Sequence, residues 1–288
     1  MSFSGDVKEE LAGKIPAARH CQLAELATIL HFCGQIGLDA DGLYRIGFQT
    51  EKEALVKKGF TLLKKTFNID SVAGVSEPEL QDILAVIGPF EEPVNPLLLK
   101  NSCCQRAFLR GAFLSVGSIS DPQKAYHLEY VCPNEEMAEQ IRSVIRCFEI
   151  EARIVARKKY QVVYLKEGSA IVDLLNVMEA PISLMDLVNT QIYKDVSNSV
   201  NRRVNCELSN IRKTVTASAR QLEDIETIRN LMGLDKLPDP LRQMAEVRLE
   251  YPEIPLKDLG EYLDPPVGKS GVNHRLRRLS EIAQQLRE

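Results

Sequence analysis

The sequence predicts an α+β domain with internal two-fold pseudosymmetry, followed by an all-α module that begins after Asp195. Three observations support this prediction. A segment near the amino terminus recurs 83 residues later, each copy continues into a strand pattern and a second amphipathic helix, and the remaining chain is polar with clustered cations. Because an internal repeat shows how many structural units a chain contains, it organises the rest of the interpretation. The length of 288 residues also favours two domains.

The repeat aligns CQLAELATILHFCGQI (21–36) with CQRAFLRGAFLSVGSI (104–119), and six of the sixteen positions are identical. Apolar residues recur at helical spacing in both segments, and each segment ends at a glycine that can cap the helix, Gly34 or Gly117. Small residues on both helices would permit close approach of the two backbones: Ala27, Cys33, Gly34, Gly111, Ser115 and Gly117. We therefore expect the repeated helices to pack against each other.

Further elements follow each helix, in copies that cover about 21–88 and 104–180. Alternating patterns predict strands over 43–50 and 126–131. A second amphipathic stripe is matched between the copies, with Val56, Phe60, Leu63, Phe67 and Ile69 aligned to Met137, Ile141, Val144, Phe148 and Ile150. We also predict strands over 71–75, 83–87, 152–156 and 160–165, and a helix over 169–178 that ends before Pro181. Helices mixed with short antiparallel strands make the domain α+β, with 1–195 as its bounds.

Residues 196–219 are polar and lack Pro and Gly. An apolar residue recurs every three or four positions, at Val200, Val204, Leu208, Ile211 and Val215, which predicts a helix with one narrow apolar stripe. The other faces carry cations, namely Arg202, Arg203, Arg212 and Lys213. These cations either solvate the helix or contact phosphates of a nucleic acid. We interpret 196–218 as a basic helical linker and 219–288 as the terminal domain.

The terminal domain is predicted to hold four helices. Ser218 can cap a helix that stops at Gly233, Asp239 and Pro240 start a helix over 241–250, and 256–263 forms a short helix before the turn at Pro265 and Pro266. The last helix is predicted to start near Ser270 as its N-cap. Its buried stripe would be Val272, Leu276, Leu279, Ile282 and Leu286.

The first two turns of this last helix expose Asn273, His274, Arg275, Arg277 and Arg278, with Lys269 just ahead and no acid before Glu281. A recognition helix needs such a surface, because Arg can pair with guanine, Asn with adenine, and cations with phosphate. Arg277 and Asn273 are our candidates for reading bases. Lys269, Arg275 and Arg278 are candidates for phosphate contacts, and His274 for either role. The alternative is an ordinary helix with a basic solvent face.

Two segments, LATILHFCG (26–34) and LRGAFLSVG (109–117), resemble the motif helices of LAGLIDADG homing endonucleases. The chain as a whole is similar to the WhiA family, through FSGDVKEELA, GSISDPQKAYHLEYV, NRRVNCELSNIRKTV and LDPPVGKSGVNHRLRRL. The resemblance implies a degenerate LAGLIDADG-like domain joined to a helix-turn-helix domain. It also implies control of sporulation or cell-division genes, binding to double-stranded DNA, and in some bacteria a WhiB-type iron-sulfur partner.

In the endonucleases, each motif helix carries an acid one residue before its final glycine, and the two acids hold divalent cations. Here those positions are Cys33 and Val116, which cannot supply the oxygen ligands that Mg²⁺ requires. We therefore expect no enzyme activity. The alternative is a residual homing endonuclease that uses the displaced acids Asp39, Asp41 or Asp121; His31 is expected to be a core residue.

Composition restricts the remaining possibilities. The net charge of −4 divides unevenly: residues 197–288 hold 15 basic and 14 acidic residues, and the rest of the chain holds 21 and 26. Nucleic acid would therefore bind to local patches.

A group of cations on the predicted hairpins is equally compatible with DNA, with a protein partner and with plain solvation: Arg45, Arg153, Arg157, Lys158 and Lys159. A domain that docks on RNA polymerase is a further alternative.

The seven cysteines form no CxxC pair, and the four histidines are scattered, so neither disulfides nor a metal site nor any other cofactor is expected.

The amino-terminal MSFSGDVKEELAGKI lacks the features of a signal peptide, and no apolar run is long enough to cross a membrane. We expect a cytoplasmic protein associated with the nucleoid. The tandem repeat already supplies pseudosymmetry, which is compatible with a monomer.

Overall fold

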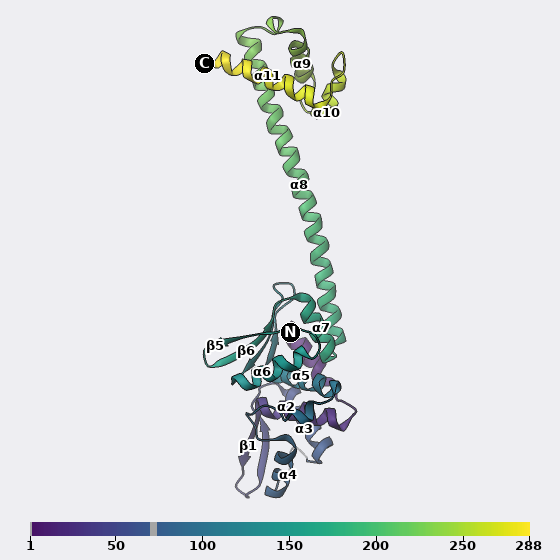
Figure 1. Cartoon of the computed structure of the whole chain (residues 1–288), viewed down its shortest axis with the longest axis vertical. Coiled ribbons are helices and arrows are strands. Elements are labelled where there is room, and N and C mark those ends of the chain that lie inside the picture. Colours follow the sequence, from purple (N-terminus) through teal and green to yellow (C-terminus); the bar gives the residue numbers. More distant parts are fainter. Residues whose placement is uncertain (1, 70–73) are drawn as a thin grey trace. The chain divides into compact units, whose positions relative to one another are not determined.

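The computed structural model describes residues 2–69 and 74–288. The chain forms two compact units, Met1–Asp195 and Val196–Glu288. The first unit contains helices and antiparallel strands, and the second contains only helices (Figure 1). The predicted fold class is therefore confirmed.

The centre of the first unit is the pair of repeated helices, α2 (Arg19–Cys33) and α5 (Ser102–Val116), which pack against each other (Figure 1). Their contact is close because Gly111 has no side chain. A Cβ atom at Gly111 would lie 2.9 Å from the backbone oxygen of Glu25 and 3.1 Å from Cβ of Thr28. The close approach expected from the small residues is confirmed at this point.

Each motif helix leads directly into a strand that the sequence did not predict. These strands are β1 (Gly34–Leu38) and β3 (Gly117–Ile119), and they pair with β2 (Tyr44–Phe48) and β4 (Leu128–Cys132), where strands were expected. The turn from helix to strand requires glycine. A Cβ atom at Gly34 would lie 2.4 Å from the Leu30 carbonyl oxygen.

The two copies have diverged beyond this shared part. Copy two adds β5 (Arg153–Arg157) and β6 (Tyr160–Leu165), which gives an antiparallel sheet in the order β3-β4-β6-β5. In the described residues of copy one, the sheet has two strands, β1 and β2. The second helices of the copies are α3 (Glu53–Phe67) and α6 (Glu135–Arg146), and α7 (Gly168–Met178) closes copy two as predicted.

The strand predicted over 83–87 is wrong, because those residues belong to helix α4 (Glu77–Ile87). A capping box between Ser76 and Glu79 starts this helix. Leu80, Ile83 and Ile87 then bury one helical face. Of the strand predicted over 71–75, residues 71–73 lie outside the described part, and Val75 forms a single bridge with Tyr44. The unpredicted helices α1 (Phe3–Gly13) and η1 (Pro96–Leu99) complete this unit.

Helix α8 (Pro181–Leu231) is continuous, so the predicted helix end near residue 219 and the N-cap at Ser218 are wrong. No Gly or Pro interrupts residues 182–231. The Ser218 hydroxyl instead donates a hydrogen bond to the carbonyl oxygen of Pro252. The second unit continues with η2 (Leu234–Lys236), α9 (Asp239–Glu250), α10 (Leu256–Leu259), η3 (Gly260–Tyr262) and α11 (Lys269–Arg287).

A buried ion network joins the elements of the first unit. Glu25 of α2 has no exposed surface, and its carboxylate lies 2.6 Å from Nζ of Lys58 on α3. Arg110 of α5 donates to both Glu25 oxygens, at 3.0 and 3.1 Å. Arg110 also reaches Glu179, which pairs with Lys14 at 2.7 Å. The network fixes the helices of both copies relative to one another.

Replacing Glu25 with Gln is expected to destabilise the first unit by about 3 kcal/mol or more, because two cations would remain buried beside a neutral amide. Urea unfolding of the full chain, followed by circular dichroism, measures the loss. The matched control is Glu53→Gln, which removes an exposed pair with Lys57 and should leave the unfolding curve nearly unchanged. Equal unfolding curves for the two variants would contradict the role of the network.

Candidate nucleic-acid interface

The core of the second unit fixes the orientation of α11. Val272, Leu276 and Leu279 are buried and pack with apolar residues of α9 and α10, such as Met244 and Leu259. Ile282 and Leu286 are partly buried against the same cluster. The predicted inward stripe is therefore confirmed, and the opposite face of α11 lies at the surface.

The N-cap of α11 is Gly268, with no side-chain capping bond, so the prediction of Ser270 as the cap is wrong. Ser270 is an exposed residue of the first turn, next to Lys269. Backbone N–H groups at an uncapped helix start, together with the helix dipole, favour an anion. Lys269 adds a full positive charge at the same place.

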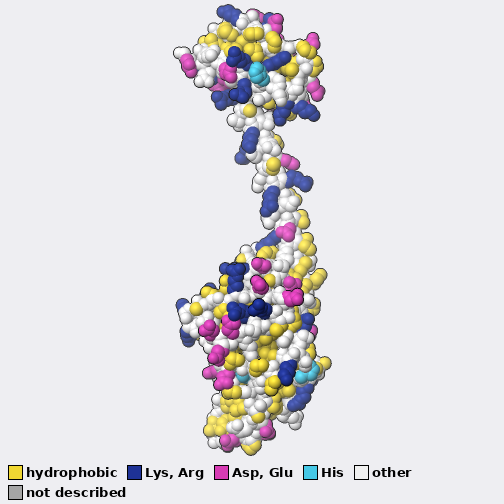
Figure 2. Space-filling model, in the orientation of Figure 1, with side chains coloured by type: hydrophobic (Ala, Val, Ile, Leu, Met, Phe, Trp, Pro, Cys, Tyr) yellow, Lys and Arg dark blue, Asp and Glu magenta, His cyan; other side chains and the backbone are white. Residues whose placement is uncertain are grey.

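The predicted base-reading residues lie on the exposed face of α11. Asn273, His274 and Arg277 are exposed, and within the described residues their side chains make no hydrogen bond or ion pair. Arg278 pairs with Glu281 at 2.8 Å, and Arg275 is half-buried and donates to the Pro240 carbonyl oxygen at 3.5 Å. Figure 2 shows Lys and Arg side chains gathered on the visible face of this unit. The helix thus presents free polar groups beside partly engaged cations.

A cavity of about 300 Å³ brings four cations of the second unit together: Lys213, Arg248, Lys257 and Lys269. None of the lining residues is acidic. Arg248 is 2% exposed, its Nη1 donates to the Ile254 carbonyl oxygen at 2.8 Å, and its Nε has no hydrogen-bond partner. Burial lowers the pKa of this guanidinium. The cavity therefore has the positive charge that an anion would require.

Arg248 was not a sequence candidate, although one signal pointed to it. It follows Leu241, Met244 and Ala245 at helical spacing, so a cation occupies the inward face of α9. Among the linker candidates, the structure brings only Lys213 to the same cavity as Lys269. Arg212 lines a separate groove along α8 together with Lys213 and Arg220, and Arg202 and Arg203 are exposed further along the helix.

In the first unit, the positions that carry acids in the endonucleases hold no metal ligands of the required kind. Cys33 Sγ lies 3.7 Å from the Ser115 hydroxyl oxygen, and it donates to the Ile29 carbonyl oxygen at 3.1 Å. Burial raises the pKa of the Cys33 thiol. Val116 is half-buried. The nearby Lys8 donates to the Leu114 carbonyl oxygen at 3.2 Å, and burial is the main cause that lowers its pKa to about 7.

Two of the displaced acids, Asp39 and Asp121, accept hydrogen bonds within their own turns. Asp39 accepts hydrogen bonds from the N–H groups of Asp41 and Leu43 and pairs with Arg45 at 3.1 Å. Asp121 accepts from the N–H of Gln123 at 2.9 Å. His31 is 3% exposed, and its ring nitrogens contact the carbonyl oxygens of Ile87 and Glu92, which confirms it as a core residue.

The hairpin cations Arg45, Arg153, Arg157, Lys158 and Lys159 are all exposed, as predicted for a solvated or binding surface. Arg157 lies 3.6 Å from Glu129, and Arg45 is paired with Asp39.

Comparison with known proteins identifies the family. Three consecutive family models match the chain: the WhiA N-terminal LAGLIDADG-like domain over 19–79, the WhiA LAGLIDADG-like domain over 105–197, and the WhiA C-terminal helix-turn-helix domain over 200–283. A relative from Lachnoclostridium phytofermentans, named probable cell division protein WhiA, is 49% identical over the full length of both chains. The chain belongs to the WhiA family.

Other WhiA proteins extend the comparison. A relative of the same name from Alkaliphilus oremlandii is 45% identical and is covered over 98% of its length. The crystal structure of full-length WhiA from Thermatoga maritima is 28% identical, with a TM-score of 0.60 and 99% coverage of each chain. The resemblance inferred from the motifs is thus confirmed. No helix in the described part of this WhiA chain is long and apolar enough to cross a membrane.

The start of α11 in this WhiA chain depends on close contact at Gly260. A Cβ atom there would lie 1.9 Å from the Val267 carbonyl oxygen. Gly260→Ala is therefore expected to destabilise the second unit by about 2 kcal/mol or more, because the backbone must move. Gly268→Ala is the control, since a Cβ there meets nothing within 4 Å, and it should change stability by less than about 1 kcal/mol. Thermal unfolding of both variants tests the contact, and a stable Gly260→Ala protein would refute it.

Proposed function

We propose that the protein is a sequence-specific double-stranded DNA-binding transcription regulator, in which α11 enters the major groove. The observation that carries the proposal is the exposed, unpartnered set of Asn273, His274 and Arg277 on a helix whose inward face is fixed by the core. Arg277 can pair with guanine and Asn273 with adenine. The first turns of α11 contain no acid that would repel phosphate.

Phosphate contacts are assigned to the cations around this helix. Lys269 stands at the uncapped helix start and lines the cavity with Lys213, Lys257 and the buried Arg248. A backbone phosphate at the cavity would meet several cations. Arg275 and Arg278 would add contacts beside it. Arg202, Arg203 and Arg212 of the linker would supply further phosphate contacts.

The relatives are named for cell division, so we propose that the regulated genes serve division or sporulation, and that the protein acts in the cytoplasm at the nucleoid. In this proposal residues 1–195 form a degenerate nuclease scaffold, 196–218 a basic linker and 219–288 the DNA-binding domain. A WhiB-type regulator or RNA polymerase would bind as a protein partner, and the regulator would act as a monomer.

Arg277→Ala and Asn273→Ala are expected to reduce the preference for the cognate site by about 1–3 kcal/mol each, since each removes a paired base contact. Lys269→Ala should weaken binding to all sequences equally and lower the salt slope by about 0.9, because one phosphate contact is lost. Selection of bound genomic fragments supplies the site, and salt-dependent titration gives the affinities. Arg229→Ala, which removes an exposed pair with Glu226, is the control that should bind normally.

The helix assignment is wrong if Arg277→Ala retains the full sequence preference. A protein that instead docks on RNA polymerase without contacting DNA would show no salt-linked binding to fragments. Contact with about four phosphates predicts a slope of about −3.6 in log affinity against log salt.

The first unit is expected to lack nuclease activity, because Cys33 and Val116 replace the metal-binding acids, and Asp39 and Asp121 accept hydrogen bonds within their own turns. Supercoiled plasmid incubated with the protein and Mg²⁺ should remain uncut. Nicking that needs Mg²⁺ and disappears in Asp39→Asn or Asp121→Asn would show a residual homing endonuclease instead.

A further inference from the structure

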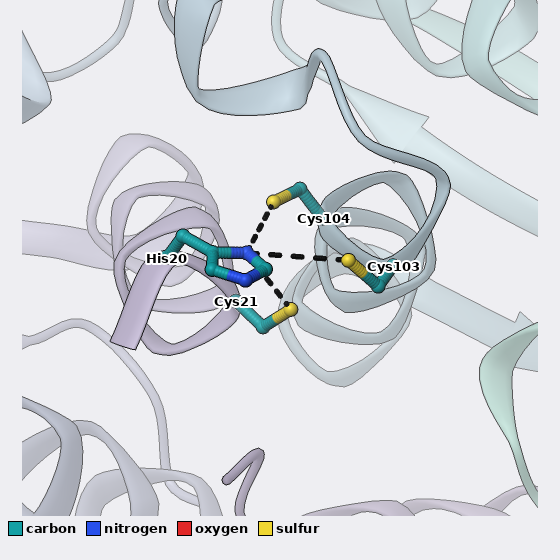
Figure 3. Close-up of side chains that lie close together, drawn as sticks. All are labelled: His20, Cys21, Cys103 and Cys104. Atoms are coloured by element: carbon teal, nitrogen blue, oxygen red, sulfur yellow. Dashed lines mark hydrogen bonds between the residues drawn. The ribbon is translucent and has the colours of Figure 1, made fainter. Parts of the chain in front are cut away.

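The side chains of His20, Cys21, Cys103 and Cys104 lie close together at the amino-terminal ends of the paired helices. His20 and Cys21 lie in the first turn of α2, and Cys103 and Cys104 lie in the first turn of α5 (Figure 3). The repeat offset of 83 aligns His20 with Cys103 and Cys21 with Cys104. The pseudosymmetry therefore brings together two adjacent pairs of donors, one from each copy.

The distances between these donors match the edges of a metal tetrahedron. The imidazole Nδ1 of His20 lies 3.1 Å from Cys104 Sγ, 3.4 Å from Cys21 Sγ and 4.0 Å from Cys103 Sγ. All four ligand atoms lie within 4.8 Å of one another. Zinc bonds of about 2.0–2.1 Å to nitrogen and about 2.3 Å to sulfur give tetrahedral nitrogen–sulfur edges of about 3.6 Å. The three nitrogen–sulfur distances straddle that value.

The donor set and its setting favour a soft or borderline cation. One imidazole and three thiols form a Cys₃His set, which is a common ligand set of structural zinc. Cys21 and Cys104 are buried, and His20 and Cys103 are exposed, so a cation has a route in from solvent. Among the described residues, this is the one group of His, Cys, Asp and Glu with such geometry.

We propose that His20, Cys21, Cys103 and Cys104 bind one zinc ion, which fastens the two repeat copies together. All four positions of the tetrahedron are filled by protein, so the site is structural and leaves no place for a substrate. It is also distinct from the position of a nuclease metal. Residues 20 and 33 stand thirteen positions apart on α2, which is about 20 Å along a helix.

Zinc binding can be measured on the full chain, purified without chelator and with reductant present. Elemental analysis should find about one zinc ion per chain. After zinc is removed, titration with Co²⁺ should give the absorption bands of tetrahedral cobalt with thiolate ligands. Cys103→Ser and His20→Asn change exposed side chains, so the fold should survive, and both variants should lose most of the metal and weaken Co²⁺ binding at least about tenfold.

The controls are Cys147→Ser and Cys206→Ser, which change exposed cysteines outside the cluster and should bind the metal fully. Zinc should also raise the unfolding temperature of the wild-type chain and not that of Cys103→Ser. No zinc in the reduced wild-type protein together with no thiolate–cobalt absorption would overturn the proposal. So would metal that remains in both Cys103→Ser and His20→Asn, or thiol counts and mass spectra showing that the cluster cysteines form a disulfide.

Discussion

The fit of α2 against α5 is the constraint on which the first unit depends. Gly111 lets the two backbones approach, and the Glu25 carboxylate then lies within reach of Arg110 and Lys58. Burying these charges is costly unless each is paired and hydrogen-bonded, so the network favours the placement of the helices in which every charge has a partner. That placement brings the starts of both helices side by side, where the His and Cys side chains gather. It also brings Cys33 to the Ser115 that precedes Val116 at the other end.

In the second unit, the packing leaves one face of the single helix α11 exposed. The apolar residues of α9, α10 and α11 form a core of their own, separate from the core of the first unit. Asp224 anchors the far end of α11, since it accepts a hydrogen bond from Ser280 at 2.6 Å and pairs with Arg287 at 3.0 Å. Because the helix is held at both ends, its outward side chains can remain without intramolecular partners.

Much of this arrangement could be predicted from the residues. The repeat predicted the helix pair, and the period of Val272, Leu276 and Leu279 predicted which face of α11 is buried. The strand expected over 83–87 failed because the copies were assumed to match, whereas Ser76 and Glu79 start a helix in copy one. The joining of α8 into one helix was missed because a composition change was taken for a boundary, although no residue there breaks a helix.

The candidate sites also could be predicted only in part from the sequence. The outward residues of α11 follow from helical periodicity alone, but Arg248 needed the fold, because its cavity is built from four separate segments. The His and Cys cluster was missed because spacing rules for metal ligands assume that the ligands are close in sequence. Here the repeat brings together two adjacent pairs that lie 83 residues apart.

The ion network is not symmetric, although the helices that carry it are related by the repeat. Glu25 aligns with Phe108, and Arg110 aligns with Ala27, so each copy supplies a charge that the other lacks. Two identical copies of either half would therefore bury Glu25 without Arg110, or Arg110 without Glu25. The two halves of the repeat therefore differ, and each depends on the other for the partner of its buried charge.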